Sequence, residues 1–221
     1  MAETTAPGLA FLDSDCVPAA DWLATARACI ATLAQVAGAG PGVVGGRIDT
    51  FDETPPPRSG AEAFETVFAF HQRSYVEDKG FSASANLLTT RAAYAATGPM
   101  VVGLSEDVDW CRRAVAAGFA LVYDDRLAVA HPPRRDWPAL RRKWRRTPDE
   151  AFPLNGTRAV DRAAWLLRAA AVAGSALVHL PRLIGSPKLS GPRERLAGGL
   201  TLLRLRLVRC GWMLRQALTG H

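Results

Sequence analysis

The sequence contains few cysteines and lacks the usual cysteine motifs of metal sites. Four cysteines occur in 221 residues, far apart at Cys16, Cys29, Cys111 and Cys210. Neither a CxxC pair nor a Cys/His cluster with zinc-site spacing is present, so the sequence predicts neither a disulfide framework nor a structural zinc site. We expect these cysteines to be reduced and to serve mainly in packing.

The sequence also lacks a long uncharged apolar run and a signal peptide. From Arg158 onward, the longest stretch without Lys, Arg, Asp or Glu is residues 169–181, well short of the ~20 residues that a membrane-spanning helix needs. The N-terminus does not combine a basic start, an apolar segment and a small-residue cleavage site. We therefore expect a cytoplasmic protein without a membrane span.

Charge is distributed unevenly along a chain of ordinary globular composition. Hydrophobic residues make up 48% and charged residues 22% of the sequence, which is enough for a buried core. Residues 1–157 carry 16 Lys+Arg and 19 Asp+Glu, whereas residues 158–221 carry 11 and 2. The basic character belongs to the tail, which indicates an anionic surface as the partner of that segment.

Short apolar strands alternate with helices through the first 130 residues. This alternation predicts an α/β layer fold. Gly45-Gly46 indicates a bulge or a close backbone approach. We expect strands at residues 8–12, 43–48, 119–123 and 127–130, an extended segment at 81–90, a proline-rich loop at 52–60, and helices at about 18–36, 61–75, 91–97 and 105–117.

The tail from Arg158 is predicted to be helical and rich in arginine. In residues 200–218, four arginines interrupt a leucine-rich sequence. Such a helix can lie at a membrane interface, with its arginines reaching towards anionic headgroups. It can equally be half of a helical pair that packs on the core and exposes a basic face to solvent. The sequence leaves both interpretations open.

Two carboxylates follow the first predicted strand. In an extended turn, Asp13 and Asp15 are two positions apart, so their side chains project to one side and can share a cation or flank a phosphate. The alternative is ordinary turn chemistry, with Asp15 as the cap of the next helix.

Further polar residues fit either a structural or a functional role. Ser105-Glu106-Asp107 suits the start of a helix, and it is also a way to present a general base at a strand-to-helix junction. His131, at the end of a strand, is a metal ligand or a structural residue. The arginine cluster around Trp144 is a solvated helix face or a phosphate-binding surface.

The order of these motifs resembles that of the family 2 glycosyltransferases. The sequence runs through DSDC-x-P, VVGGRID, SANLLTTRAAY, SEDVDWCRRAVAAGFALVYDD and HPPRRDWPALRRKWRR. The most specific part is ED-x-D-x-x-x-R-x-x-x-x-G, at residues 106–118. The resemblance implies a partial GT-A-type α/β sheet (the nucleotide-diphospho-sugar transferase fold) with flanking helices. Residues 1–150 would then be the C-terminal portion of that domain, and 151–221 a basic amphipathic helical tail.

The resemblance also implies roles for particular residues. The ligands of Mg²⁺ or Mn²⁺ would be Asp13, Asp15 and His131, and the general base would be Asp107. Substrate-binding residues would be Asn86, Glu106, Trp144 and Arg145, the last two towards the diphosphate. One base and one metal motif suit a single displacement with inversion at the sugar carbon.

The implied partners follow from the same resemblance. They are a nucleotide-sugar donor and a glycan or lipid-linked acceptor, with no nucleic acid. The basic tail would place the protein at the inner face of the plasma membrane. Family members carry a nucleotide-binding half ahead of the Asp-x-Asp strand, whereas only residues 1–7 precede it here. We therefore expect a truncated start and a chain that is incomplete or inactive alone.

Two other classes of function fit parts of the sequence. In a haloacid-dehalogenase-like phosphohydrolase, Asp13 would be the nucleophile and Asp15 the acid/base, with Asp124-Asp125 and Lys143 completing the site. That assignment leaves the SED and HPPRR segments unexplained. The other alternative is a non-catalytic protein of the membrane surface, whose carboxylates serve as caps and turns.

Overall fold

The chain folds into two compact units, each made of two separate stretches of sequence. The computed structural model describes residues 5–35, 41–101, 105–156 and 158–220. The first unit contains Met1–Phe51 and Phe70–Pro132, and the second contains Asp52–Ala69 and Pro133–His221. This division differs from the expected boundary at residue 150, because a short internal segment belongs with the C-terminal helices.

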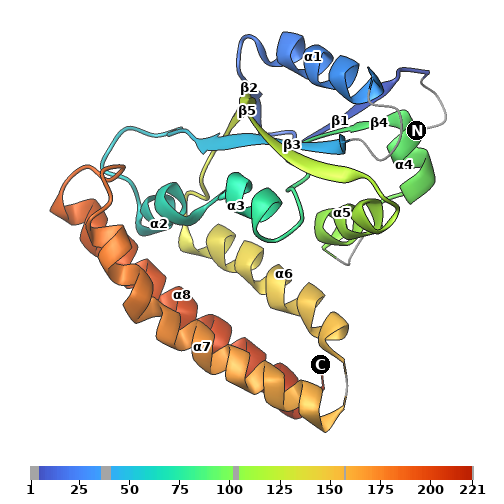
Figure 1. Ribbon diagram of the computed structural model, residues 1–221. Helices are drawn as coiled ribbons and strands as arrows, with labels where there is room; N and C mark the ends of the chain where they lie inside the picture. Colours follow the sequence, from blue (N-terminus) through green and yellow to red (C-terminus); the bar gives the residue numbers. More distant parts are fainter. Residues whose placement is uncertain (1–4, 36–40, 102–104, 157, 221) are drawn as a thin grey trace. The chain divides into compact units, whose positions relative to one another are not determined.

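The first unit is built on a five-stranded mixed sheet (Figure 1). The strand order is β1-β4-β3-β5-β2, with β3 and β5 parallel and the other neighbours antiparallel. Its strands are β1 (Gly8–Leu12), β2 (Val17–Pro18), β3 (Pro41–Thr50), β4 (Asn86–Thr90) and β5 (Ala120–His131). Its helices are α1 (Trp22–Gln35), α3 (Gln72–Glu77), α4 (Arg91–Thr97) and α5 (Glu106–Ala116). The predicted mixed α/β class is confirmed.

Helices cover both faces of this sheet (Figure 1). The apolar face of α1 packs against Val44, Leu88 and Val129, and α5 packs against Val43 and Leu87. Neighbouring residues such as Val43 and Val44 serve different cores because successive side chains of a strand point to opposite faces. The helical spacing read from the sequence of α1 is confirmed by its buried residues Trp22, Ala26, Cys29 and Leu33.

Three predicted elements have different boundaries. Pro18 pairs with Val129 in β2, so the first helix begins later, at Trp22. The helix expected over 61–75 is two helices, α2 (Gly60–Phe68) and α3, separated at Phe70, whose φ is +53°. The two strands expected around Asp124 are the single strand β5. The break at Phe70 lies where the chain leaves the second unit and enters the first.

The sheet contains the irregularity that the two glycines indicated. The register between β3 and β5 shifts between Gly46 and Arg47. The side-chain amide of Asn86 donates to the carbonyl oxygens of Arg47 (2.9 Å) and Leu127 (2.8 Å) at this point. A side chain on Gly46 would collide with Asn86 and with the Leu127 carbonyl. The glycine therefore permits a close approach of three strands.

The second unit is helical and consists of α2, α6 (Trp137–Asn155), α7 (Ala159–Ile184) and α8 (Pro192–Thr219). Phe64 of α2 packs with Leu140, Leu183, Leu202 and Leu205 in its main core. A smaller core joins Trp165 to Met213 and Ala217. The predicted helical tail is thus an α7–α8 hairpin. In the described part of the chain, α7 is the one helix long and apolar enough, by length and composition, to cross a membrane.

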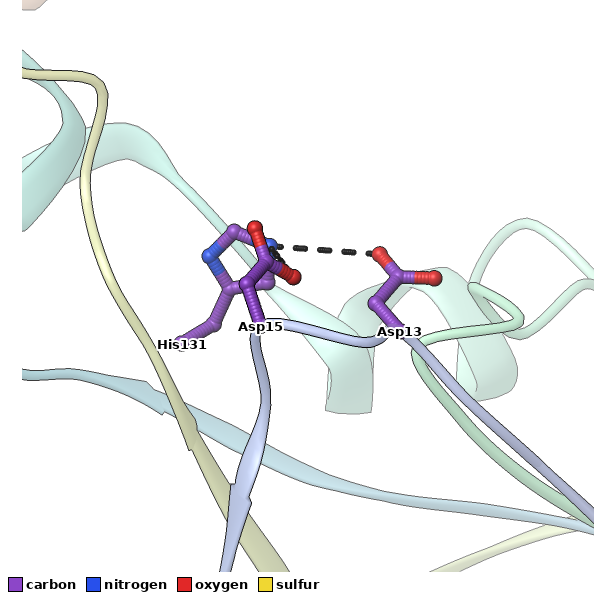
Figure 2. Close-up of side chains that lie close together, drawn as sticks. All are labelled: Asp13, Asp15 and His131. Atoms are coloured by element: carbon purple, nitrogen blue, oxygen red, sulfur yellow. Dashed lines mark ion pairs between the residues drawn. The ribbon is translucent and has the colours of Figure 1, made fainter.

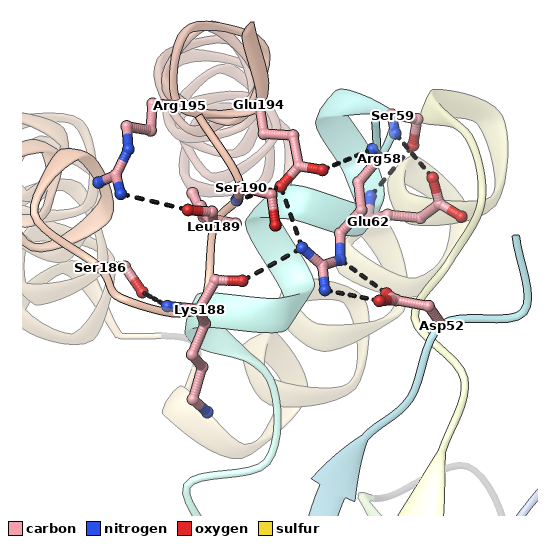
Figure 3. Close-up of polar contacts among 10 residues, drawn as sticks. All are labelled: Asp52, Arg58, Ser59, Glu62, Ser186, Lys188, Leu189, Ser190, Glu194 and Arg195. Atoms are coloured by element: carbon pink, nitrogen blue, oxygen red, sulfur yellow. Dashed lines mark hydrogen bonds and ion pairs between the residues drawn. The ribbon is translucent and has the colours of Figure 1, made fainter. Parts of the chain in front are cut away.

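A buried ion pair ties the hairpin to the segment before α2 (Figure 3). Glu194 is fully buried and accepts hydrogen bonds from the amides of Arg58 (2.9 Å) and Ser190 (2.8 Å) and from the Arg58 guanidinium (3.0 Å). Arg58 also pairs with Asp52. Burial acts to raise the pKa of Glu194, but these bonds outweigh it and lower the pKa.

Candidate functional site

Asp13, Asp15 and His131 come together at the end of strand β1 (Figure 2). The distance from His131 Nε2 is 3.2 Å to Asp15 Oδ1 and 3.9 Å to Asp13 Oδ2. The three potential ligand atoms all lie within 4.8 Å of one another. The structure thus brings together the residues that were predicted to bind the metal.

Local backbone structure explains this meeting of distant residues. The amide of Cys16 donates to the carbonyl of Asp13 (3.0 Å), which closes a tight turn after β1. Directly after that turn, Val17 pairs with Ala130 of β5. Because His131 follows Ala130 and ends the strand, the short β2 pairing places the aspartate turn beside the imidazole.

The His131 ring is held in one orientation and one tautomer. Its Nδ1 lies 2.7 Å from the carbonyl oxygen of Pro132, which accepts and therefore requires hydrogen on Nδ1. The ring also packs against Phe70, with 4.7 Å between centroids. In the neutral ring, Nε2 then presents its lone pair to the two carboxylates.

This arrangement fits a bound cation. His131 is buried, and its Nε2 makes no hydrogen bond of normal geometry among the described residues, although it lies 3.2 Å from Asp15 Oδ1. A lone pair facing carboxylate oxygens is unfavourable unless a positive charge, either a proton on the nitrogen or a bound cation, lies between them. An imidazole fixed through its other nitrogen, together with two half-exposed carboxylates, is a common donor set for divalent metal ions. The group can hold a metal ion.

Asp107 lies in the first turn of α5 and is partly buried. Its Oδ1 accepts from the amide of Val108 (2.8 Å), and the backbone of Ser84 lies close enough to act against the rise in its pKa. Burial raises the pKa of Asp107, and the neighbouring Glu106 adds to the increase. A carboxylate with a raised pKa is better suited to accept a proton from a hydroxyl group.

The segment before β4 contacts both the aspartate turn and Asp107. Cys16 Sγ donates to the carbonyl of Ala85 (3.5 Å), and the backbone of the preceding residue, Ser84, lies near the Asp107 carboxyl group. Cys16 is adjacent to Asp15 in the chain. Two neighbouring backbone groups therefore connect the metal-binding group with the predicted base.

The predicted substrate-binding residue Asn86 has a structural role as well. It is fully buried, its oxygen accepts from the Trp22 indole (3.1 Å), and its amide hydrogens bond the carbonyls of Arg47 and Leu127. All its polar atoms thus have partners inside the protein. Its contact with an acceptor stays a prediction, as does that of Glu106.

Trp144 and Arg145 belong to the second unit and have partners there. Trp144 packs edge-on against Phe64 (6.0 Å between centroids) and lies under the guanidinium of Arg209 (4.4 Å). Arg145 pairs with Asp149 at 2.7 Å. These contacts explain their local positions within α6, and their role towards a diphosphate stays a prediction.

An apolar cavity lies beside the sheet. It has a volume of about 580 Å³ and lies between β1 and α1, with Leu9, Trp22, Ala26 and Ile30 in its wall. Its lining is chiefly hydrocarbon, which does not suit a charged diphosphate. The carboxylate and imidazole group is therefore the better candidate site.

Comparison with known proteins agrees with the chemistry of this group. No family model matches the chain. The chain is similar to a glycosyltransferase. Glycosyltransferase AglE of Haloferax volcanii is 26% identical over 140 residues, which are 62% of this chain and 43% of the relative. The chain therefore spans less than half of that relative.

The phosphohydrolase alternative is not favoured. Asp124 bonds Arg126 and Cys29, and Asp125 bonds Arg47 and Tyr123. Lys143 pairs with the buried Glu65 of α2. The glycosyltransferase similarity, by contrast, agrees with the resemblance on which the metal and base assignments rest.

Sequence reasoning missed residues that orient the site. Phe70 and the Pro132 carbonyl fix the His131 ring, and the Val108 amide bonds Asp107. Backbone groups carry no residue-type signal. Pro132 directly after the histidine was visible in the sequence, but nothing there showed that its carbonyl turns back to Nδ1.

Proposed function

We propose that this chain supplies the metal-binding and acceptor-side groups of a family 2 glycosyltransferase of the GT-A fold. The enzyme would move a sugar from a nucleotide-sugar donor to an acceptor hydroxyl with inversion. The observation that carries this proposal is the Asp13, Asp15 and His131 group, in which the imidazole Nε2 faces both carboxylates. The similarity to a glycosyltransferase supports it.

Asp13, Asp15 and His131 would hold Mg²⁺ or Mn²⁺, which supplies positive charge against the diphosphate of the donor. The chain's own contribution is to orient these ligands: the Cys16 turn sets the aspartates, and the Pro132 carbonyl sets the imidazole. Fixed ligands reduce the reorganisation needed when the substrate binds.

Asp107 would accept the proton of the attacking hydroxyl. Its partial burial favours the protonated carboxyl group, so the carboxylate is a stronger base than one in water. Glu106 would lie beside it in the acceptor site, with Asn86 on the same side. Trp144 and Arg145 would face the diphosphate. The acceptor would be a glycan or a lipid-linked sugar on the cytoplasmic side of a membrane.

The first experiment is a measurement of Mn²⁺ binding by the 221-residue chain, using electron paramagnetic resonance of the free ion. Asp13→Asn and Asp15→Asn should each weaken binding by at least about tenfold, because each removes an anionic ligand. Both aspartates are half-exposed, so the fold should persist. Unchanged affinity in both variants would contradict the proposed metal site.

Asp78→Asn is the matched control for this experiment. Asp78 is an exposed aspartate at the C-terminal end of α3 and is not part of the metal-binding group. The Asp78→Asn variant should bind Mn²⁺ like the unmodified chain. Asp107→Asn should also keep the metal affinity and remove sugar transfer wherever transfer is measurable. Release of phosphate from a simple aryl phosphate would instead favour a phosphohydrolase.

A further inference from the structure

The α7–α8 hairpin exposes many large apolar side chains. Leu167 and Leu177 are each 74% exposed, and Leu218 is 76% exposed. The exposed leucines of α8 follow one another at intervals of four or seven residues, which places them on one face of that helix. The exposed apolar residues are Val160, Leu167, Leu177, Val178 and Ile184 on α7, and Leu196, Leu200, Leu207, Leu214 and Leu218 on α8. An extended apolar surface of this kind indicates an interaction site.

The same hairpin carries positive charge that the protein does not neutralise. Residues 158–221 contain 11 Lys+Arg and 2 Asp+Glu. Both acidic residues are already paired, Asp161 with Arg158 (3.0 Å) and Glu194 with Arg58 (3.0 Å). Within the described residues, neither Arg168 nor Arg204 has an ion pair with a carboxylate. These two arginines are exposed and lie over the rings of Trp165 and Trp137.

Two further arginines have unsatisfied donors. The Nε atoms of Arg206 and Arg209 are buried and have no hydrogen-bond partner in the described part of the chain. Burial lowers the pKa of Arg209 to about 10, and the charges of Arg206 and Arg168 add to this effect. Both side chains have neighbours within the second unit, Arg209 over the Trp144 ring and Arg206 beside His179. They add to the positive charge of the hairpin, and the arginines available to an outside anion are exposed ones such as Arg168 and Arg204.

We propose that the α7–α8 hairpin lies flat on an anionic lipid bilayer. Its exposed leucines would enter the boundary between headgroups and acyl chains, and its arginines would bind lipid phosphates. Both the extended apolar surface and the excess of positive charge favour this partner. The proposal concerns the second unit alone and does not depend on the sugar transfer proposed above.

The structure favours this orientation over a membrane span and over a dimer. A span by both helices would place Arg204, Arg206 and Arg209, in the middle of α8, at the centre of the bilayer, where arginine is strongly disfavoured. The hairpin is also packed against α2, a helix of the same unit. A symmetric dimer through the leucine surface would bring two strongly basic segments together.

The test is flotation of the purified 221-residue chain with vesicles of phosphatidylcholine, alone or mixed with phosphatidylglycerol. We expect binding to the mixed vesicles that weakens as salt increases. Arg168→Gln/Arg204→Gln should lower the partition coefficient about thirtyfold, because each basic residue near an anionic surface contributes about fivefold. Leu177→Gln/Leu207→Gln should lower it by at least about tenfold.

Matched variants in the first unit test whether the loss of vesicle binding is specific to the α7–α8 hairpin or follows from any change in charge or apolar surface. Arg27→Gln/Arg112→Gln makes the same change in net charge at exposed positions of α1 and α5. Leu23→Gln/Val115→Gln makes similar apolar-to-polar changes on the same two helices. Both variants should bind like the unmodified chain. Circular dichroism of every variant checks that the fold is kept, and the salt dependence of the unmodified chain remains decisive if one variant does not fold.

Several results would overturn the proposal. The first is that the chain does not bind vesicles containing phosphatidylglycerol, and the second is that the control variants lose as much vesicle binding as the hairpin variants. The third is that the bound chain resists extraction with alkaline carbonate, which would indicate that α7 spans the bilayer. A dimer in sedimentation equilibrium that Leu177→Gln/Leu207→Gln dissociates, without a change in vesicle binding, would assign the leucine surface to a second copy.

Discussion

His131 shows how far single residues can be predicted from this sequence. Its position at a strand end and the spacing of Asp13 and Asp15 predicted three potential ligands, and the structure places them together. The contacts that orient the ring were not predictable. Phe70 and the Pro132 carbonyl act through tertiary geometry, which leaves no pattern in the sequence. Likewise, no motif indicated that Asn86 is fully buried.

The partly buried carboxylate of Asp107 should reduce stability at neutral pH. Because its folded pKa is raised, the folded state holds the proton to higher pH than the unfolded state. Stability should therefore fall as pH rises from the unfolded pKa through the folded pKa. Asp107→Asn removes this effect and should increase the free energy of unfolding at pH 7 by about 1 kcal/mol, with a smaller difference near pH 3. Urea unfolding of the variant and of the unmodified chain at both pH values measures this difference in the free energy of unfolding.

Asp109→Asn is the control for this prediction because it makes the same chemical change two residues further along the same helix. Its carboxylate pairs with Arg113 at 2.9 Å. Removing its charge should lower stability slightly at pH 7, by about 0.3–0.5 kcal/mol. A less stable Asp107→Asn at pH 7 would show that the Asp107 charge stabilises the fold and would weaken its assignment as a base.

At the scale of elements, the sequence predicted most helices and strands but not where tertiary packing interrupts or joins them. Residues 61–75 have helix-forming character throughout, yet the helix breaks at Phe70 because neighbouring stretches pack into different cores. Asp124-Asp125 looks like a turn, yet β5 continues through it. There, Arg126 and Arg47 pair with the two carboxylates and the register shift absorbs the extra residues.

Asn86 should be essential for the join between β3, β4 and β5. Asn86→Ala would leave the Arg47 and Leu127 carbonyls and the Trp22 indole without partners inside the protein. Each unsatisfied buried group costs about 1–3 kcal/mol, so the variant should lose about 3–5 kcal/mol in denaturant unfolding. Thr89→Val, which removes one buried bond to the Gly42 carbonyl, should lose about 1 kcal/mol. Equal losses in the two variants would contradict this role.

At the scale of the whole molecule, the division into two units was not predictable from local patterns. The sequence showed a change of charge near Arg158 and therefore indicated a tail. The structure instead assigns residues 52–69 to the same unit as that tail. The cause is long-range packing of α2 on α8, between residues more than a hundred positions apart. Compositional boundaries and packing boundaries therefore differ in this chain.

This interleaving predicts that the basic tail does not fold alone. A fragment of residues 158–221 would lack Phe64, which packs against Leu183, Leu202 and Leu205, and Arg58, which neutralises the buried Glu194. Loss of one partner of a buried ion pair is strongly destabilising, by about 3–5 kcal/mol. Thermal circular dichroism should therefore show a gradual loss of helix for the fragment and a cooperative transition for the full chain. A cooperative transition of the fragment would show that the α7–α8 contacts suffice. Because we expect the gradual loss, vesicle binding has to be measured on the full chain, where α2 holds the hairpin in place.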